Sequence, residues 1–389
     1  MATSGVPRSA DVVIVGGGVV GCATAFFAGR AGLSTVLLEK RPALATLTTP
    51  VSSGAFRLQF DNPEEIALVR ESVALFDELQ DRGHDLELRR QGYLFVATTQ
   101  DGAAAQAELV ARQREWGLDD VELMSGEEAR RRFPYLAEGL CGARFRQRDG
   151  WLNPRRLSQA LAAESAATVL LDREVVGLER QGDRVTGVRL ADGVVSAGWV
   201  VIAAGPLSAG LAIKAGIDLP IQLVRRHKLV VPDAPQVPGR APMTIEYETG
   251  AHWRPALRGA YGLWTAPAPA EGAREDLPAS AEFGFGLLDP RSDHALARVA
   301  PFWKEVWETP GLQWWLQAGY YDYTPDRRPL LGPTPVPGLA LNTGYSGHGI
   351  MGSGGGSRRV IDAITGRIEP RDNPLRPDRP MLERRFDVL

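Results

Sequence analysis

Three glycines near the N-terminus have a spacing that could bind phosphates. Gly16, Gly18 and Gly21 follow the pattern G-x-G-x-x-G between two apolar stretches. Glycines at these positions suit a tight turn, the close approach of a phosphate to bare backbone, and tight packing of a helix on a strand. The free N–H groups at the start of that helix would face a pyrophosphate. Glu39 ends the next apolar stretch, where a carboxylate can bind a ribose hydroxyl. The spacing therefore predicts a dinucleotide site.

The residues around these glycines predict the elements that must position them. The β-branched run 12–15 is typical of a buried parallel strand, 19–31 of a helix, and 34–38 of a second strand. A transmembrane or signal segment is the alternative interpretation. It is disfavoured because the glycines and Arg30 interrupt the apolar run, and because Glu39 and Lys40 end it too early.

Composition limits the class of protein. A chain of 389 residues exceeds what one core usually supports, so we expect two domains. The 44% hydrophobic and 23% charged residues are typical of a soluble globular protein. A net charge of −3 argues against nucleic acid or an anionic membrane as partner. Cys22 and Cys141 are the two cysteines, so we expect no disulfide framework and no metal site. We expect a cytoplasmic location, because the N-terminus carries no targeting pattern.

Further elements follow from periodicity and turn residues. Apolar spacing predicts a helix over 63–82. The charged and Pro-rich sequence after Glu369 predicts a tail that lies extended on the surface. The stretch "NTGYSGHGIMGSGGGS" follows a short apolar strand and leads into another helix, so it offers a second helix N-terminus to a cofactor. Other helices are expected over 102–116 and 125–132 and from about residue 154, and strands over 92–99, within 175–205 and over 339–341.

Four separated stretches resemble one known family when they are combined with the opening motif. They are "TTPVSSGAF", "DGWLNPRRL", "TPDRRPLLG" and "NTGYSGHGI". In order and spacing the chain from Ala10 to Gly366 resembles the FAD-dependent amine and amino-acid oxidases related to glycine oxidase, monomeric sarcosine oxidase and D-amino-acid oxidase. The resemblance implies a mixed α/β (α+β) fold, with a Rossmann-type FAD-binding domain interleaved with a substrate domain on a large mixed β-sheet. The implied FAD-binding domain comprises 1–62, 146–216 and 318–373, the substrate domain 63–145 and 217–317, and the surface tail 374–389.

The resemblance also implies which residues contact FAD. Gly16, Gly18 and Gly21 would serve the pyrophosphate, Glu39 the adenosine ribose, and Val175 the adenine through its backbone. Residues 344–350 would line the pyrimidine edge of the flavin, where helix dipoles stabilise negative charge. The other implied contacts are Lys40, Thr48, Thr49, Ser53, Gly54, Phe56, Gly205, Gly344, Gly347, His348, Gly349 and Ile350.

The implied reaction is oxidation of a carbon–nitrogen bond. Hydride passes from the α-carbon of an amine to flavin N5, the imine hydrolyses, and O2 reoxidises the flavin to give H2O2. The nearest alternative is a dehydrogenase that passes electrons to an acceptor other than oxygen. An NAD(P)-dependent dehydrogenase would leave the second glycine-rich loop without a role, and a non-catalytic FAD-binding protein is the remaining class. Gly319 stands where some sarcosine oxidases have a cysteine bound to flavin, so we expect non-covalent FAD.

Two carboxylate anchors of the family are missing here. Met351 stands in place of the lysine of sarcosine oxidases, and Tyr321 in place of the arginine of glycine oxidases. We therefore expect a bulkier or N-substituted amino acid as a small-molecule substrate together with O2, and a role in specialised biosynthesis. The sequence does not fix the oligomeric state. The candidate catalytic residues are Arg57, Tyr247, Arg254, Tyr321 and His348.

Each candidate has a structural alternative. Arg254 could bind a carboxylate or form a surface ion pair. His348 is expected to be a packed loop residue rather than a base. Lys228 lies in the charge run "RRHK", which we expect to be solvated rather than to help activate oxygen. The tryptophans at 303, 307, 314 and 315 are expected in the core or at a domain interface.

Overall fold

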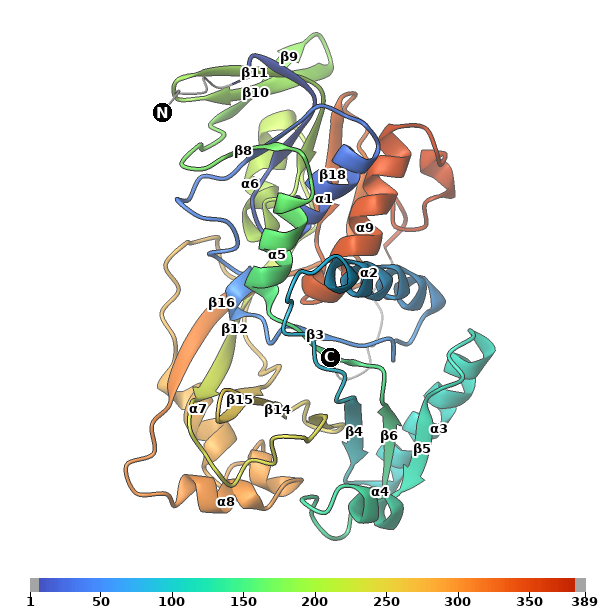
Figure 1. Cartoon of the computed structure of the whole chain (residues 1–389), viewed down its shortest axis with the longest axis vertical. Coiled ribbons are helices and arrows are strands. Elements are labelled where there is room, and N and C mark those ends of the chain that lie inside the picture. The colour runs from blue at the N-terminus through green and yellow to red at the C-terminus, as the bar shows by residue number, and fades with distance from the viewer. Residues whose placement is uncertain (1–6, 382–389) are drawn as a thin grey trace.

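The computed structural model describes residues 7–381. Within that range the chain forms two eight-stranded sheets, one in each half of the molecule, with helices packed around them (Figure 1). Both sheets mix parallel and antiparallel pairs. The mixed α/β fold class is therefore confirmed.

The first sheet is built around the N-terminal strand β1 (Ser9–Val15). It runs parallel to β2 (Thr35–Leu38) on one side and to β11 (Gly193–Ile202) on the other. Residues 12–15 are buried on both faces, as the continuous apolar run predicted. The order across the sheet is β17 (Leu330–Pro333), β18 (Leu339–Thr343), β11, β1, β2 and β8 (Thr168–Leu170), while β10 (Arg184–Leu190) pairs with β11 and with β9 (Gly177–Gln181).

Three helices cover one side of this sheet. α1 (Val19–Arg30) packs between α9 (Gly349–Ile364) and α5 (Pro154–Ala163). α2 (Pro63–Asp81) packs on α9 near the middle of the molecule (Figure 1). Segments from both ends of the chain therefore build one layer.

The second sheet has two faces with different partners. Leu229 and Trp253 lie on one face and pack in one apolar cluster with Leu287 of α7 (Ala281–Leu288) and Trp303 of α8 (Phe302–Trp307). The opposite face presents a separate cluster that includes Tyr93, Ile245 and Leu263. The strand order is β16 (Trp315–Tyr323), β12 (Gln222–Val231), β15 (Gly259–Leu263), β14 (His252–Ala256), β13 (Met243–Glu246), β4 (Tyr93–Ala97), β6 (Gly142–Arg146) and β5 (Glu122–Ser125).

The remaining elements connect or flank the two sheets. β3 (Ala55–Phe56) pairs with β7 (Gly150–Trp151) between the halves. The helices expected near 102–116 and 125–132 are α3 (Gln100–Glu115) and α4 (Gly126–Arg132), and α6 (Ser208–Ala212) follows β11.

The segment expected as a surface tail is partly packed. Leu375 is fully buried, and Arg379 forms an ion pair with Asp326 at 2.8 Å. The end of the predicted tail, 382–389, lies outside the described residues. No helix within residues 7–381 is both long and apolar enough to cross a membrane.

Candidate cofactor and substrate site

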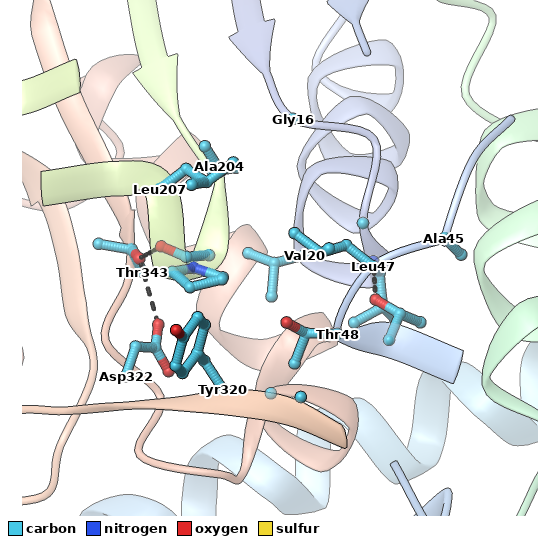
Figure 2. A pocket seen from close by; sticks show the side chains of 18 of the residues that line it. Gly16, Val20, Ala45, Leu47, Thr48, Ala204, Leu207, Tyr320, Asp322 and Thr343 are labelled. Carbon is cyan, nitrogen blue, oxygen red and sulfur yellow. Dashed lines mark hydrogen bonds between the residues drawn. The ribbon is translucent and has the colours of Figure 1, made fainter. Parts of the chain in front are cut away.

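A cavity of about 340 Å³ opens at the carboxyl edge of the first sheet (Figure 2). Its wall includes Gly16 after β1, Glu39 after β2 and Gly205 after β11. Gly347 and Ile350 contribute from the start of α9. Ligands of open α/β sheets bind at this edge, where the loops after parallel strands meet.

The glycine turn after β1 has no room for side chains. Gly16 has a φ of +114°, and a Cβ there would lie 2.5 Å from the carbonyl oxygen of Ala203. A Cβ on Gly21 would lie 1.8 Å from the carbonyl oxygen of Gly16, so Gly21 lets α1 pack against the turn. Gly18 begins α1 without a side chain that could cap the helix. The backbone nitrogen of Val19 donates to Thr49 Oγ1 at 3.2 Å, and the positive end of the helix still faces the cavity.

Glu39 is held at the edge of the cavity by backbone groups. Its Oε2 accepts a hydrogen bond from the backbone nitrogen of Gly17 at 2.7 Å, and its Oε1 accepts one from that of Arg41 at 2.8 Å. Lys40 and Val175 line the same part of the wall. A carboxylate fixed in this way can bind ribose hydroxyls.

Asp322 of β16 joins the second sheet to the glycine-rich loop. Its Oδ2 accepts a hydrogen bond from the backbone nitrogen of Gly344 at 2.9 Å. It accepts a second one from Thr343 Oγ1 at 3.4 Å (Figure 2). Burial raises the pKa of this carboxyl to about 6, although the Gly344 hydrogen bond opposes the shift. The sequence analysis missed Asp322, because no motif includes it.

Tyr345 explains the glycine-dense start of α9. Its ring is buried, and its hydroxyl donates a hydrogen bond to Asn342 Oδ1 at 2.6 Å. A Cβ on Gly352 would lie 2.8 Å from the ring, and one on Gly356 would lie 2.0 Å from the hydroxyl. The glycines of this helix therefore make room for Tyr345, which lies within the predicted flavin-lining range 344–350 and lines the cavity.

The cavity fits FAD. The bare glycine turn and the positive N-terminal end of α1 suit a pyrophosphate, and Glu39 suits a ribose. The start of α9 faces the same cavity and supplies a second positive helix end. Predicted site residues that line this cavity are Gly16, Gly18, Glu39, Lys40, Thr48, Thr49, Val175, Gly205, Tyr321, Gly347, Gly349 and Ile350.

Other predicted contacts lie behind the cavity wall. Phe56 is fully buried and packs edge-on against Phe76. His348 Nδ1 lies 3.3 Å from Glu65 Oε1, and its ring packs edge-on against Phe60. The backbone carbonyl of Ser53 accepts hydrogen bonds from Arg254. Gly21, Gly54 and Gly344 are not among the residues that line this cavity.

Tyr247 lies at a different place from the cavity. Its ring lies beside Gly102 at the start of α3, and its backbone nitrogen bonds to Val96. The structure therefore does not bring Tyr247 together with the other candidates.

Lys228 contradicts the expectation of a solvated charge run. Its side chain is only 3% exposed, because β12 is a central strand and Lys228 pairs with Leu263 on one side and Gln317 on the other. Successive side chains of a strand point to opposite faces of the sheet, so Arg226 and Lys228 lie on the same face. That face is directed toward the first half of the molecule.

A face with aromatic and cationic side chains adjoins the cavity. Leu263 and Tyr321 line the cavity, and Leu263 shares an apolar cluster with Tyr93. Burial raises the pKa of Tyr93 above its usual range, while the positive charges of Arg57 and Arg254 oppose that shift. The guanidinium of Arg57 is buried and lies 4.4 Å from the ring centre of Phe60. Tyr93 was missed because it falls in an ordinary strand pattern.

Comparison with known proteins identifies the family. The sequence model of the FAD dependent oxidoreductases (DAO) matches residues 11–363. The chain belongs to this family. As an FAD-dependent oxidoreductase it is an enzyme, and FAD is its cofactor, as the sequence predicted.

Individual relatives span nearly the whole chain. FAD-dependent oxidoreductase domain-containing protein 1 of Xenopus laevis is 29% identical, with 92% of this chain and 79% of the relative covered. The crystal structure of L-proline dehydrogenase from P. horikoshii has a TM-score of 0.83 at 23% identity, covering 93% of this chain and 95% of the other. Glycine oxidase from Bacillus cereus has a TM-score of 0.79 at 24% identity, covering 96% and 100%. These two structures show that the fold is shared.

Proposed function

We propose that this FAD-dependent oxidoreductase oxidises the carbon–nitrogen bond of an amino acid or an N-substituted glycine. The observation that carries the proposal is the buried arginine beside the face that adjoins the cofactor cavity. Arg57 lies under this face, and its charge acts on Tyr93. Two structurally similar proteins, the proline dehydrogenase and the glycine oxidase, are named for amino acids.

The substrate would lie between the flavin and the second sheet. Arg57 would bind the substrate carboxylate, because a guanidinium held over Phe60 and Phe95 keeps a fixed plane for a two-point contact. Tyr93 is buried and Tyr321 is half-buried. Desolvation raises the pKa of both phenols, that of Tyr321 to about 12, so both stay protonated and can donate hydrogen bonds. These contacts orient the α-carbon and exclude water.

FAD, when bound, supplies the electron acceptor for the hydride that leaves the α-carbon. We propose O2 as the final acceptor, with H2O2 as product, and a non-oxygen acceptor as the alternative, since one similar structure is called an oxidase and the other a dehydrogenase. We also propose that FAD is held without a covalent bond, because Gly319 has no nucleophile and its place is packed against Val51. The cytoplasmic location, the domain limits and a biosynthetic role stay predictions from the sequence.

The absorbance spectrum of the purified protein tests this proposal. We would record the flavin bands before and after anaerobic addition of a panel of amino acids and N-alkylglycines. Bleaching by one compound is expected, and failure of every amine to bleach bound flavin would contradict the proposed reaction. Air and a dye acceptor, added separately to the bleached sample, then distinguish an oxidase from a dehydrogenase. Denaturation followed by ultrafiltration tests whether FAD is covalently attached, because non-covalent FAD passes through the filter.

A further inference from the structure

A second cavity of about 740 Å³ lies behind the segment 50–53 that borders the cofactor cavity. Ser52 lines both cavities, so this segment is the wall between them. The N-terminus of α5 and the strands β12, β14 and β15 provide the other sides. The charged residues that line it are Asp85, Glu87, Arg89, Arg155, Lys228, Arg254 and Arg258; Arg258 forms an ion pair with Asp233.

Two buried cations face this cavity without a carboxylate partner. Lys228 is 3% exposed and Arg254 is 7% exposed. Lys228 Nζ donates to the carbonyl oxygens of Pro50 at 3.0 Å and Ser52 at 3.1 Å, and Arg254 Nε donates to that of Ser53 at 2.8 Å. Within residues 7–381 neither cation forms an ion pair with a carboxylate. A buried charge that lacks a counter-charge is costly, and an anion would remove that cost.

The rest of the lining adds positive charge. Asn153 caps α5 by accepting from the backbone nitrogens of the first turn, and the exposed Arg155 follows at the cavity wall. The positive end of this ten-residue helix therefore points into the same space. The acidic side chains of the lining, Asp85 and Glu87, form ion pairs with Arg156. The charge of Glu87 also acts on Arg254, where it opposes the lowering of the arginine pKa by burial, but it forms no ion pair with Arg254.

Aromatic side chains hold the two cations in place. Arg254 lies 5.1 Å from the ring centre of Trp151 and 4.6 Å from that of Tyr261, and Lys228 Nζ lies 4.6 Å from the same tyrosine ring. The cavity thus combines fixed positive charge with flat apolar surfaces, which suits an organic anion better than a bare ion.

We propose that this second cavity binds an organic anion that carries a carboxylate or a phosphate, with Lys228 and Arg254 as its main contacts. The segment 50–53 keeps this ligand away from the flavin, so the site is distinct from the substrate site and does not depend on the proposed reaction. Because both cations now bind carbonyl oxygens of that segment, an anion that draws them away would loosen the wall of the cofactor cavity. The site therefore offers a way for an anion to act on the cofactor side.

Proton uptake gives this site a distinctive signature. Burial, with the nearby positive charges of Arg254 and Arg155, lowers the pKa of Lys228 to about 7. The groups that face Lys228 are these two arginines, the phenol of Tyr261 and the neutral amide of Gln317. An anion favours the charged lysine, so binding above pH 7 takes up a proton and weakens as the pH rises.

Calorimetric titration of the FAD-saturated protein with sodium phosphate and with sodium succinate tests the proposal. Chloride would hold the ionic strength constant, and bound FAD would block the pyrophosphate site. We expect one saturable site, tighter for one of the two anions, and a binding heat at pH 8 that changes between phosphate-free buffers of different ionisation enthalpy. Preference for phosphate or for succinate identifies which headgroup the ligand carries.

Variants make the assignment specific. Lys228→Met should weaken the preferred anion at least tenfold and abolish the proton uptake, whereas the same change at the exposed Lys304 should leave both unaltered. If Lys228→Met does not fold, Arg155→Gln at the exposed wall should still weaken binding severalfold. The proposal would be overturned if neither anion shows saturable binding at 10 mM. It would also be overturned if the Lys228→Met variant binds the anion as tightly as the wild type. If Lys228→Met does not fold, equal binding by the wild type and the Arg155→Gln variant would overturn it instead.

Discussion

The carboxylate of Asp322 and the backbone nitrogen of Gly344 lie 2.9 Å apart and join β16 to the glycine-rich loop. Asp322 belongs to the second sheet, and Gly344 directly follows β18 of the first sheet, so this contact links the two halves of the molecule at the cofactor cavity. The carboxyl group is half-buried, and its desolvation raises its pKa to about 6.

Asp322 should make stability depend on pH. Its pKa is higher in the folded state than the ordinary 3.8, so the folded protein holds this proton more tightly and loses stability as the pH rises from about 4 to 6. In urea unfolding of the FAD-saturated protein, Asp322→Asn should gain stability relative to wild type over that window. Asp218→Asn, at an exposed position, should show no such trend, and parallel curves for wild type and Asp322→Asn would count against the raised pKa.

Gly21→Ala should damage the cofactor turn. The added Cβ would lie 1.8 Å from the carbonyl oxygen of Gly16, so backbone must move. We expect a loss of about 1–3 kcal/mol in unfolding free energy and loss of FAD from the purified protein. Gly239→Ala is the matched control, because a Cβ there meets nothing within 4 Å. Equal flavin content in the two variants would contradict the packing role of Gly21.

Glu275 connects the loop 265–280 to the FAD-binding half. It forms ion pairs with Lys40 and Arg41, both of which line the cofactor cavity. Glu275→Gln should release FAD about two- to fivefold faster at low salt, because an exposed pair contributes up to about 1 kcal/mol. The difference should vanish in 1 M salt. Stopped-flow flavin fluorescence measures the rate, with Glu282→Gln as control; a difference that persists in high salt would rule out the ion pairs as its cause.

Substitution of Arg57 should separate substrate binding from cofactor binding. Arg57→Met removes the charge proposed to hold the carboxylate, and we expect the amine concentration for half-bleaching to rise by about 10- to 100-fold. Arg57→Lys should recover part of this loss, since a lysine keeps the charge without the planar two-point contact. Arg70→Met, on an exposed helix face, should leave the titration unchanged. If only the amount of bound flavin falls, Arg57 serves the cofactor instead.

The sequence predicted the parts of the site that are local. The turn from Gly16 to Gly21 and the following helix could be predicted because spacing within one short stretch decides their geometry. The fold class followed from the resemblance over most of the chain. Both were confirmed.

Residues whose role depends on distant pairing were missed. Lys228 sits in a run of charges, and only the pairing of β12 with β15 and β16 shows that it is buried. Tyr93 and Asp322 belong to ordinary strands, and their neighbours at the cavity come from other parts of the chain. Tyr247 was selected for its position beside Arg254 in sequence, but the turn between β13 and β14 carries it toward α3.

The order of strands in the first sheet has a consequence for biosynthesis of the holoenzyme. β1 is made first, but β18 and α9, which complete the cofactor cavity, lie at residues 339–364. A ribosome must therefore translate nearly the whole chain before the last wall of the cavity exists. FAD loading is accordingly a late event in the life of the nascent chain, and a truncated product that lacks α9 would leave the ribosome without a complete flavin pocket.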